Sequence, residues 1–234
     1  MKTAIITGGS RGIGLGIAQY LLNDGYHVMI TGRNQKRLDE AVELLSNENP
    51  DKIVGQVSDV TSLESENAAV QAILNKWGRL DVVVANAGVG HFASIQDMTE
   101  LQWKDVIDIN LTGVFNTTKA SLEALIRSKG YLITIASLAG TNFFKGGAAY
   151  NASKFGLVGF TQAVMLDVRH HGVKVTTIMP GSVSTYFNNH TPSDADRWKI
   201  QPEDLGQMVV DLLHMNPRTL PSKIEVRPSM PPSR

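Results

Sequence analysis

The sequence predicts an α/β fold in which a parallel sheet is covered by helices on both faces. Short apolar runs alternate along the chain with longer amphipathic segments, a pattern typical of strand–helix–strand units. A glycine-rich turn follows the first strand, and polar residues follow later strands, so candidate ligand-binding groups gather at one edge of that sheet. The 234 residues fit one domain of this class, which we expect to span 1–234.

Seven runs are predicted to be strands because they are short, apolar and bounded by glycine, proline or polar residues. They span 3–7, 26–31, 52–57, 80–88, 131–137, 173–181 and 222–226. The run at 80–88 is the most apolar. Segments with helical spacing separate these strands, so we expect parallel neighbours joined by right-handed crossovers.

The intervening segments carry apolar residues at helical spacing. In the first of them Ile13, Ile17 and Leu21 recur at four-residue intervals, and Gly25 stands where a helix ends. Pro202 occupies a first-turn position of the last one. The helices predicted after the first cover 33–47, 62–78, 99–129 with a possible break near Gly113, 150–171 and 201–215. The longest stretch without a pattern, 182–200, is interpreted as a substrate loop or lid.

Composition narrows the functional classes. Lys plus Arg and Asp plus Glu number 22 each, so no net charge draws the chain to nucleic acid or an acidic membrane. The absence of cysteine excludes disulfides, thiolate metal sites and a cysteine nucleophile, and we predict no metal. No apolar run approaches the ~20 residues that span a bilayer. Met1 runs almost directly into a strand, so we expect a soluble, cytoplasmic protein with an irregular, proline-rich tail at 227–234.

The turn after the first strand has the spacing of a phosphate-binding loop. Gly8, Gly12 and Gly14 form T-G-x-x-x-G-x-G, in which the backbone can turn sharply and let a pyrophosphate approach. Free amides at the following helix start would hold the phosphates. The spacing departs from G-x-G-x-x-G, since residue 17 is isoleucine, so a tight glycine turn without a ligand is the alternative.

The end of the second strand indicates which dinucleotide is bound. An NAD site places an acidic residue there, whereas an NADP site leaves space and adds an arginine. Here Gly32 stands at that position, Arg33 follows, and Arg11 of the glycine loop can reach the same region. Two guanidinium groups suit a 2′-phosphate, so we predict NADP(H) rather than NAD(H). The alternative is that both arginines are solvated surface charges.

A serine, a tyrosine and a lysine form the candidate reactive group. Ser137 ends a strand, Tyr150 follows 13 residues later, and Lys154 lies one helical turn beyond. Residues four apart share a helix face, so the ammonium group can lie near the phenol. We expect this cation to lower the tyrosine pKa from ~10 toward the range of a general acid/base. The Y-x-x-x-K pattern alone occurs by chance on many helices.

These motifs together resemble those of the classical short-chain dehydrogenase/reductase family, over nearly all of the chain. The loop TGGSRGIG matches the family's coenzyme motif, and Ser137, Tyr150 and Lys154 match its active site. Further matches are Asp59-Val60, Asn86-Ala87-Gly88, Asn110 in VIDINLTGVF and Pro180-Gly181-Ser182-Val183-Ser184-Thr185. Ala85 departs from the pattern, because the family more often has a second asparagine there. The resemblance implies a single-domain, doubly wound Rossmann fold whose seven-stranded parallel sheet has the order 3-2-1-4-5-6-7.

The resemblance also implies roles for the matching residues. Tyr150 would exchange a proton with a carbonyl or alcohol oxygen that Ser137 holds, while a nicotinamide exchanges hydride. Lys154 would lower the tyrosine pKa and bind the nicotinamide ribose, and Asn110 would hold a water that links Lys154 to solvent. The implied coenzyme contacts are Gly8, Ser10, Arg11, Gly12, Ile13, Gly14, Arg33, Asp59, Val60, Asn86, Ala87, Gly88, Tyr150, Lys154, Pro180, Gly181, Val183 and Thr185.

The expected activity is therefore NADP(H)-dependent: hydride passes between the nicotinamide and a small carbonyl compound or its secondary alcohol. The alternatives are a coenzyme-sensing regulator and an epimerase or dehydratase on the same scaffold; four intact active-site residues favour the dehydrogenase or reductase. Segments 89–95 and 182–200 are expected to decide the substrate. Leu138, Phe143, Phe144 and Phe187 indicate an apolar pocket, although core packing explains them about as well. Surplus apolar residues on helices 99–129 and 150–171 suggest a homodimer or homotetramer.

Overall fold

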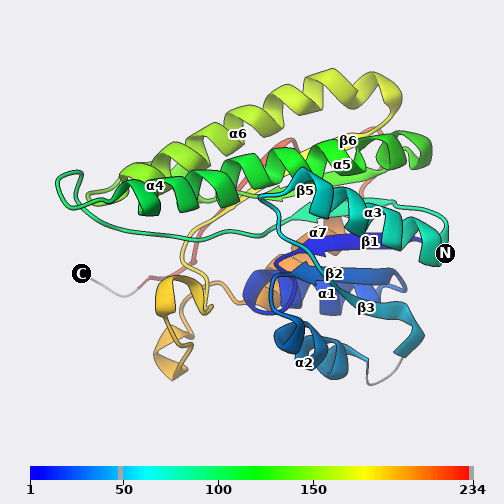
Figure 1. The fold of residues 1–234 in the computed structure, drawn as a ribbon, viewed down its shortest axis with the longest axis horizontal. Coiled ribbons are helices and arrows are strands. Elements are labelled where there is room, and N and C mark those ends of the chain that lie inside the picture. Colours follow the sequence, from blue (N-terminus) through cyan, green and yellow to red (C-terminus); the bar gives the residue numbers. More distant parts are fainter. Residues whose placement is uncertain (47–49, 232–234) are drawn as a thin grey trace.

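The computed structural model describes residues 1–46 and 50–231 (Figure 1). It contains a seven-stranded sheet with the order β3-β2-β1-β4-β5-β6-β7, and every neighbouring pair is parallel. The predicted sheet order and strand direction are confirmed. The strands are β1 (Thr3–Thr7), β2 (His27–Gly32), β3 (Ile53–Val57), β4 (Val82–Ala85), β5 (Tyr131–Ile135), β6 (Lys174–Pro180) and β7 (Lys223–Val226).

Helices cover both faces of this sheet (Figure 1). The helices are α1 (Gly12–Asn23), α2 (Gln35–Leu45), α3 (Leu63–Trp77), α4 (Glu100–Ile107), α5 (Gly113–Ser128), α6 (Ala148–Val168) and α7 (Pro202–His214). One face carries α1, α2 and α7, and the other carries α3, α5 and α6, with α4 packed against α6. The predicted helix 33–47 reaches a residue outside the described ranges, as do the last three residues of the predicted tail.

Alternate side chains of each strand enter two separate cores. Ala4 and Ile6 of β1 pack with Ile17 of α1 on one face. Ile5 packs with Ile73 of α3 on the other face. Because successive strand residues point to opposite sides of a sheet, the strand is buried on both faces. This two-sided burial explains why the strands read as continuous apolar runs rather than as alternating patterns.

Strand β4 is shorter than the predicted run 80–88, because the chain leaves the sheet after Ala85. The backbone N–H groups of Asn86 and Ala87 both donate to Thr7 Oγ1, at 3.0 and 3.1 Å. The end of β1 therefore captures these amides in place of a strand neighbour. The last part of the predicted strand becomes a loop at the carboxyl edge of the sheet.

The predicted helix 99–129 is interrupted next to Gly113, as the sequence predicts. Residues Asp108–Thr112 form a π-helical turn between α4 and α5. Gly113 is the first residue of α5, and a Cβ built on it would lie 2.7 Å from Val60 Cγ2, so the close approach of the two segments requires glycine. Such π turns are frequent at functional sites. This one carries Asn110.

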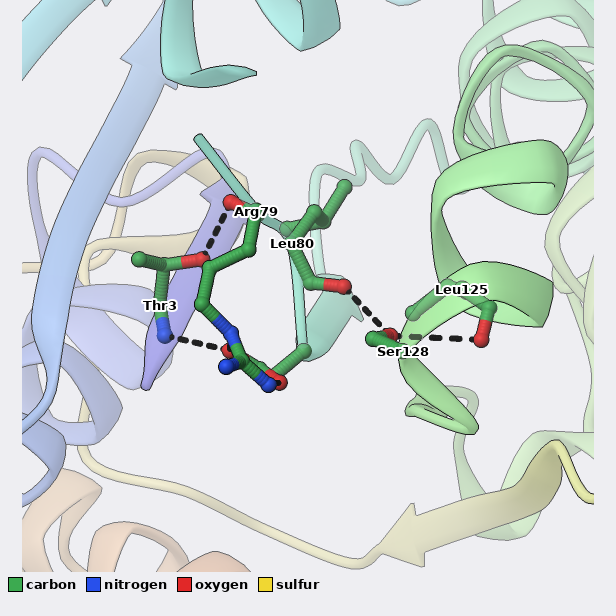
Figure 2. A network of polar contacts seen from close by, with 6 residues as sticks. Thr3, Arg79, Leu80, Leu125 and Ser128 are labelled. Atoms are coloured by element: carbon green, nitrogen blue, oxygen red, sulfur yellow. Dashed lines mark hydrogen bonds and ion pairs between the residues drawn. The ribbon is translucent and has the colours of Figure 1, made fainter. Parts of the chain in front are cut away.

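Polar contacts join the beginnings of the central strands to the end of α5 (Figure 2). Thr3 N donates to Asp81 Oδ2 at 2.8 Å, and Thr3 Oγ1 donates to the Arg79 carbonyl at 2.6 Å. Ser128 Oγ donates to the Leu80 carbonyl at 2.7 Å. These contacts lie at the amino edge of the sheet. They hold the scaffold at the end opposite to the glycine loop.

The segment 182–200 forms a loop whose two ends lie together. Ser184 N donates to the Ile200 carbonyl at 2.9 Å, and Ile200 N donates to the Ser182 carbonyl at 3.1 Å. The loop contains two short 3₁₀ turns, Phe187–Asn189 and Asp194–Asp196.

Among the described residues, no helix combines the length and apolarity needed to cross a membrane.

Candidate active site

The glycine loop packs tightly against the segment that follows β4. Gly8 and Gly12 adopt left-handed backbone angles, with φ of 65° and 55°. A Cβ built on Gly8 would lie 3.0 Å from Ala87 Cα, and one on Gly14 would lie 2.6 Å from Asn86 Nδ2. Each of these positions therefore requires glycine, for conformation or for space. The loop exposes backbone instead of side chains at the carboxyl end of β1.

Helix α1 begins directly after this loop with Arg11 as its N-cap residue. No described side chain caps α1, and its first turn holds no acidic residue. Its first backbone N–H groups therefore remain available, and the positive end of the helix dipole favours an anion. A Cβ built on Gly12 would lie 3.3 Å from Thr185 Cγ2, so the predicted 180–185 segment meets the glycine loop.

Asn86 holds the loop after β4 against the loop after β1. Its Nδ2 group donates to the carbonyls of Thr7, at 2.9 Å, and Gly8, at 3.2 Å. Thr7 Oγ1 in return accepts two backbone N–H groups, as described for β4. The structure thus brings Asn86, Ala87 and the glycine loop together, as the sequence predicts. Thr7, the first residue of the T-G-x-x-x-G-x-G motif, organises this junction, a role that the motif alone did not predict.

The end of β2 is open where an acidic side chain would stand in an NAD site. A Cβ built on Gly32 would lie 3.7 Å from Leu38 Cδ2 and 3.8 Å from Ser10 Oγ, which leaves ordinary contact distances. Arg33 beside it is exposed. A cavity of about 380 Å³ next to the glycine loop is lined by Ser10, Arg11, Leu15, Arg37, Glu40, Ala41, Leu44 and Tyr186.

Arg37 is a candidate anion-binding residue that the sequence analysis missed. It lies in the first turn of α2 and lines the same cavity as Arg11. The signal that could have found it is its position in the sequence, shortly after the end of β2. Glu40 brings a carboxylate to this cavity, and that group is also 3.9 Å from Lys36 Nζ.

Asp59 and Val60 follow β3 at the same sheet edge. Asp59 Oδ1 accepts from Thr61 N at 3.0 Å, which fixes the turn. The Val60 carbonyl accepts from Asn116 Nδ2 at 2.8 Å, and its side chain is buried against Gly113. The two residues are therefore held firmly beside the π turn.

Tyr150 and Lys154 lie in the first two turns of α6, on one face. Lys154 Nζ is 5.7 Å from the centroid of the Tyr150 ring and donates to the Ile135 carbonyl at 3.0 Å. Ser137 lies just past β5, where its Oγ accepts from Ala139 N at 3.1 Å. The Ser137 side chain also acts on the phenol, whose pKa it lowers. The serine, the tyrosine and the lysine thus meet in space as the sequence predicts.

The electrostatics of this group differ from the expectation. Burial raises the pKa of Tyr150, and the hydrogen bond to Ser137 lowers it only in part. Burial also lowers the pKa of Lys154 to about 8; only 5% of its surface is exposed. The prediction that Lys154 lowers the tyrosine pKa is therefore wrong, because burial of the phenol has the largest effect and raises that pKa. The ammonium group is itself desolvated, and it contacts a backbone carbonyl.

Asn110 is fully buried on the π turn. Its Oδ1 accepts from Val89 N at 2.8 Å, and its Nδ2 donates to the Val89 carbonyl at 2.9 Å and to Ser153 Oγ at 3.1 Å. Both amide hydrogens are thus used by protein groups, so only the second lone pair of Oδ1 is left for a water. The side chain positions the backbone after Gly88, whose built Cβ would lie 3.8 Å from Lys154 Nζ.

A backbone hydrogen bond fixes the start of segment 181–185, which follows β6. Gly181 N donates to the Val226 carbonyl at 2.8 Å, and a Cβ on Gly181 would lie 3.1 Å from Leu138 Cδ1. Val183 forms a parallel bridge with Ile200. Pro180, Gly181, Val183 and Thr185 therefore follow a fixed course from β6 to the glycine loop. Leu138, predicted to line a pocket, packs on Gly181.

Aromatic residues gather around Tyr150. Phe144 and Phe187, both predicted, belong to this group, whereas Phe143 is 86% exposed. Phe92 was missed, although it lies in the predicted substrate segment 89–95. Within residues 1–46 and 50–231, no three His, Cys, Asp or Glu side chains are grouped as a metal site would need.

Known proteins share this sequence and this fold. A model of the short chain dehydrogenase family matches residues 2–196. An uncharacterized oxidoreductase of Staphylococcus saprophyticus is 32% identical over 228 residues, which make up 97% of each chain. A 3-oxoacyl-[acyl-carrier-protein] reductase of Chlamydia muridarum is 36% identical over 185 residues, covering 79% of this chain and 75% of the relative.

A solved structure matches the whole molecule. The alcohol dehydrogenase of the archaeon Thermococcus sibiricus, complexed with 5-hydroxy-NADP, superimposes with a TM-score of 0.92 at 29% identity, over 100% of both chains. The family model alone covers most of the sequence. The protein is thus an oxidoreductase, and the chain belongs to the short-chain dehydrogenase family.

Proposed function

We propose that this enzyme interconverts a carbonyl compound and its secondary alcohol with NADP(H) as coenzyme. The observation that carries the proposal is the meeting of Ser137, Tyr150 and Lys154 at the sheet edge that also holds the glycine loop. A phenol, a hydroxyl and a buried ammonium group beside a dinucleotide site suit proton transfer coupled to hydride transfer. We take residues 1–234 as one domain and 182–200 as its substrate loop.

The residues present fit a dinucleotide. The amides of Gly12, Ile13 and Gly14 would bind the pyrophosphate at the uncapped start of α1. Asp59 and Val60 would border the adenine. The loop Asn86-Ala87-Gly88 would support the nicotinamide half together with Pro180, Gly181, Val183 and Thr185. Lys154 would bind the nicotinamide ribose. The Thermococcus alcohol dehydrogenase carries an NADP derivative on the same fold, which supports this assignment.

The cations near β2 support NADP(H) over NAD(H). Ser10 and Arg11 line one cavity with Arg37, and Arg33 is exposed beside Gly32, which has no side chain to repel a phosphate. Guanidinium groups bind phosphate by paired, charge-assisted hydrogen bonds. The catalytic efficiency with NADPH should therefore clearly exceed that with NADH, and the reverse preference would refute this assignment.

In the reducing direction, hydride adds to the carbonyl carbon and a proton adds to the carbonyl oxygen. NADPH would supply the hydride. Tyr150 would give its phenolic proton to the oxygen as the C=O bond becomes C–O–H, and Ser137 would hold that oxygen by a hydrogen bond. The raised pKa keeps Tyr150 protonated, so the phenol carries the proton that the reduction requires. Lys154 would hold the nicotinamide ribose beside the phenol, and Asn110 would position the loop next to Lys154.

The test is NADPH oxidation with a panel of ketones and aldehydes. Consumption of NADPH with formation of the alcohol supports the proposal. An epimerase or dehydratase would convert its substrate without net NADPH consumption, and a coenzyme-sensing regulator would bind NADPH without turnover. Either result would exclude the carbonyl reductase activity.

The assembly and the location stay predictions from the sequence. Phe115 of α5 and Phe155 and Leu166 of α6 are exposed large apolar side chains in the predicted interface helices. Their exposure supports a homodimer or homotetramer through these helices. Analytical ultracentrifugation would decide the state, and a monomer at micromolar concentration would contradict it. We also keep the prediction of a cytoplasmic location.

A further inference from the structure

Three phenylalanine rings from three separate segments form one cluster, and two of them contact Tyr150. The centroid of the Phe92 ring is 5.5 Å from that of Tyr150, with an interplanar angle of 83°. The Phe187 ring is 5.6 Å from the Tyr150 ring and 6.2 Å from Phe92. Phe144 meets the Phe92 ring edge-on at 5.6 Å. We call Phe92, Phe144 and Phe187 the aromatic cage.

Core packing does not explain these rings. Phe92 is 42% exposed and Phe144 is 46% exposed, so a large part of each ring faces solvent. Exposed apolar surface is costly when it is concentrated at one place, and it marks binding sites more often than isolated exposed side chains do. Here Phe92 contacts the ring of the phenol that is proposed to transfer the proton, and Phe144 contacts Phe92.

The backbone is shaped to bring Phe187 into the cage. A Cβ built on Gly90 would lie 2.5 Å from Phe187 Cζ and 3.1 Å from Phe92 Cζ, so the two rings occupy their present positions because this residue has no side chain. Asn188 and Asn189, directly after Phe187, both adopt left-handed angles, with φ of 52° and 59°. Two consecutive non-glycine residues in this region are strained, and such strain collects where a site needs a particular geometry.

Polar groups of the same segments are occupied elsewhere. Asn151 Nδ2 donates to the carbonyls of Ala139 and Asn142, both at 2.8 Å. His91 Nε2 lies 2.7 Å from Asp105 Oδ2. Lys145, next to Phe144, is exposed. The surface that these segments offer beside Tyr150 is therefore mainly aromatic.

We propose that the aromatic cage binds an aryl group attached to the reacting carbonyl carbon, so that the substrates are aryl ketones and the matching aryl carbinols. This inference rests on the proposed function. A flat ring can meet the faces and edges of the cage phenylalanines once Phe187 moves aside on its loop. Each ring contact is worth roughly 2- to 12-fold in affinity beyond the area it buries.

A pair of ketones of similar size tests the cage. Acetophenone and cyclohexyl methyl ketone differ in the aromaticity of one ring. The wild-type enzyme with NADPH should show a kcat/KM for acetophenone about 10-fold or more above that for the cyclohexyl compound. Phe92→Leu should reduce this ratio by roughly 2- to 12-fold. The matched control is Phe115→Leu on α5, an exposed ring in edge contact with Phe160 at 6.4 Å, which should leave the ratio unchanged.

Binding gives a readout that does not need turnover. Calorimetric titration of acetophenone into Tyr150→Phe enzyme with NADPH should give a Kd below that of the cyclohexyl ketone, and Phe92→Leu in this background should remove the difference. Thermal melts check that each variant folds.

Equal kcat/KM values for the two ketones overturn the aryl assignment and leave the reductase proposal standing. A kcat/KM at least 10-fold higher for a 3-oxoacyl thioester, such as acetoacetyl-N-acetylcysteamine, than for acetophenone would likewise overturn the aryl assignment and leave the reductase proposal standing. A protein that binds NADPH but oxidises it with none of these compounds overturns both proposals.

Discussion

Replacement of Gly14 by alanine tests how tightly the glycine loop and the loop after β4 are packed. The added methyl group would lie 2.6 Å from Asn86 Nδ2, 2.6 Å from the Gly8 carbonyl oxygen and 2.9 Å from Gly9 Cα. Two of these neighbours are backbone, so they cannot rotate away. The Asn86 amide would have to give up its hydrogen bonds to Thr7 and Gly8.

The expected cost follows from these contacts. Overpacking in a tight site costs about 1–3 kcal/mol, and each lost hydrogen bond costs about 1 kcal/mol. The better backbone entropy of alanine in a helix returns about 0.5–1 kcal/mol. The net loss of unfolding free energy is about 2–4 kcal/mol, which lowers Tm by about 4–16 °C in a chain of this size.

Thermal denaturation with and without NADPH measures both effects. In the wild type, NADPH at 100 times its Kd should stabilise the fold by about 2.7 kcal/mol, and Gly14→Ala should lose most of this gain because the phosphate cradle is displaced. Gly159→Ala on α6 is the control: no described atom beyond its own helix lies within 4 Å of the added Cβ. It should stabilise slightly. If Gly14→Ala had the Tm of the wild type and the same rise in Tm on addition of NADPH, the predicted clash at this position would be refuted.

Three further predictions concern the coenzyme, the buried lysine and the substrate loop. Arg37→Gln should weaken NADP⁺ binding by about 10-fold in fluorescence titrations and leave NAD⁺ binding unchanged, because only NADP⁺ carries the 2′-phosphate; Lys36→Gln is the control, and equal losses for both coenzymes would contradict it. The pKa of Lys154 falls from 10.5 to about 8 on folding. Between pH 8 and pH 10.5 the unfolded chain therefore binds more protons than the folded chain, so the free energy of unfolding rises with pH over this range. Lys154→Met should remove this rise, seen in urea titrations, and stabilise the fold at pH 7 by up to about 3 kcal/mol while abolishing activity; an unchanged pH profile would count against it. Asp196→Asn should speed proteolysis within 182–200, because this carboxylate pairs with His190 and Lys199 at 2.5 Å; the exposed Asp194→Asn is the control, and equal cleavage rates would contradict it.

The sheet was predictable because its signals are local. Runs such as Thr3–Thr7 are apolar and β-branched, so burial on both faces can be read from the residues themselves. The glycine turn and the helix start at Pro202 are also local. The end of β4 was not, because it depends on Thr7, a residue 79 positions away from Asn86 that captures the chain.

The site was predictable as a set of residues but not as an environment. Spacing alone places Tyr150 and Lys154 on one helix face. It cannot show that burial of the phenol raises the Tyr150 pKa, or that Lys154 is itself desolvated and bonded to the Ile135 carbonyl. Arg37 and Phe92 were missed for a similar reason: neither belongs to a motif, and only packing brings them to the site.

The pre-steady-state rate of NADPH oxidation by wild-type and Tyr150→Phe enzyme tests the central claim most directly. With a ketone that the wild type reduces, loss of the phenolic proton should lower the rate of the chemical step by ~10²–10⁴-fold, the usual contribution of a positioned acid. The Kd for NADPH should stay within about 3-fold of the wild-type value, because the ring itself is kept. A variant that reduces the ketone at nearly the wild-type rate would show that another group supplies the proton.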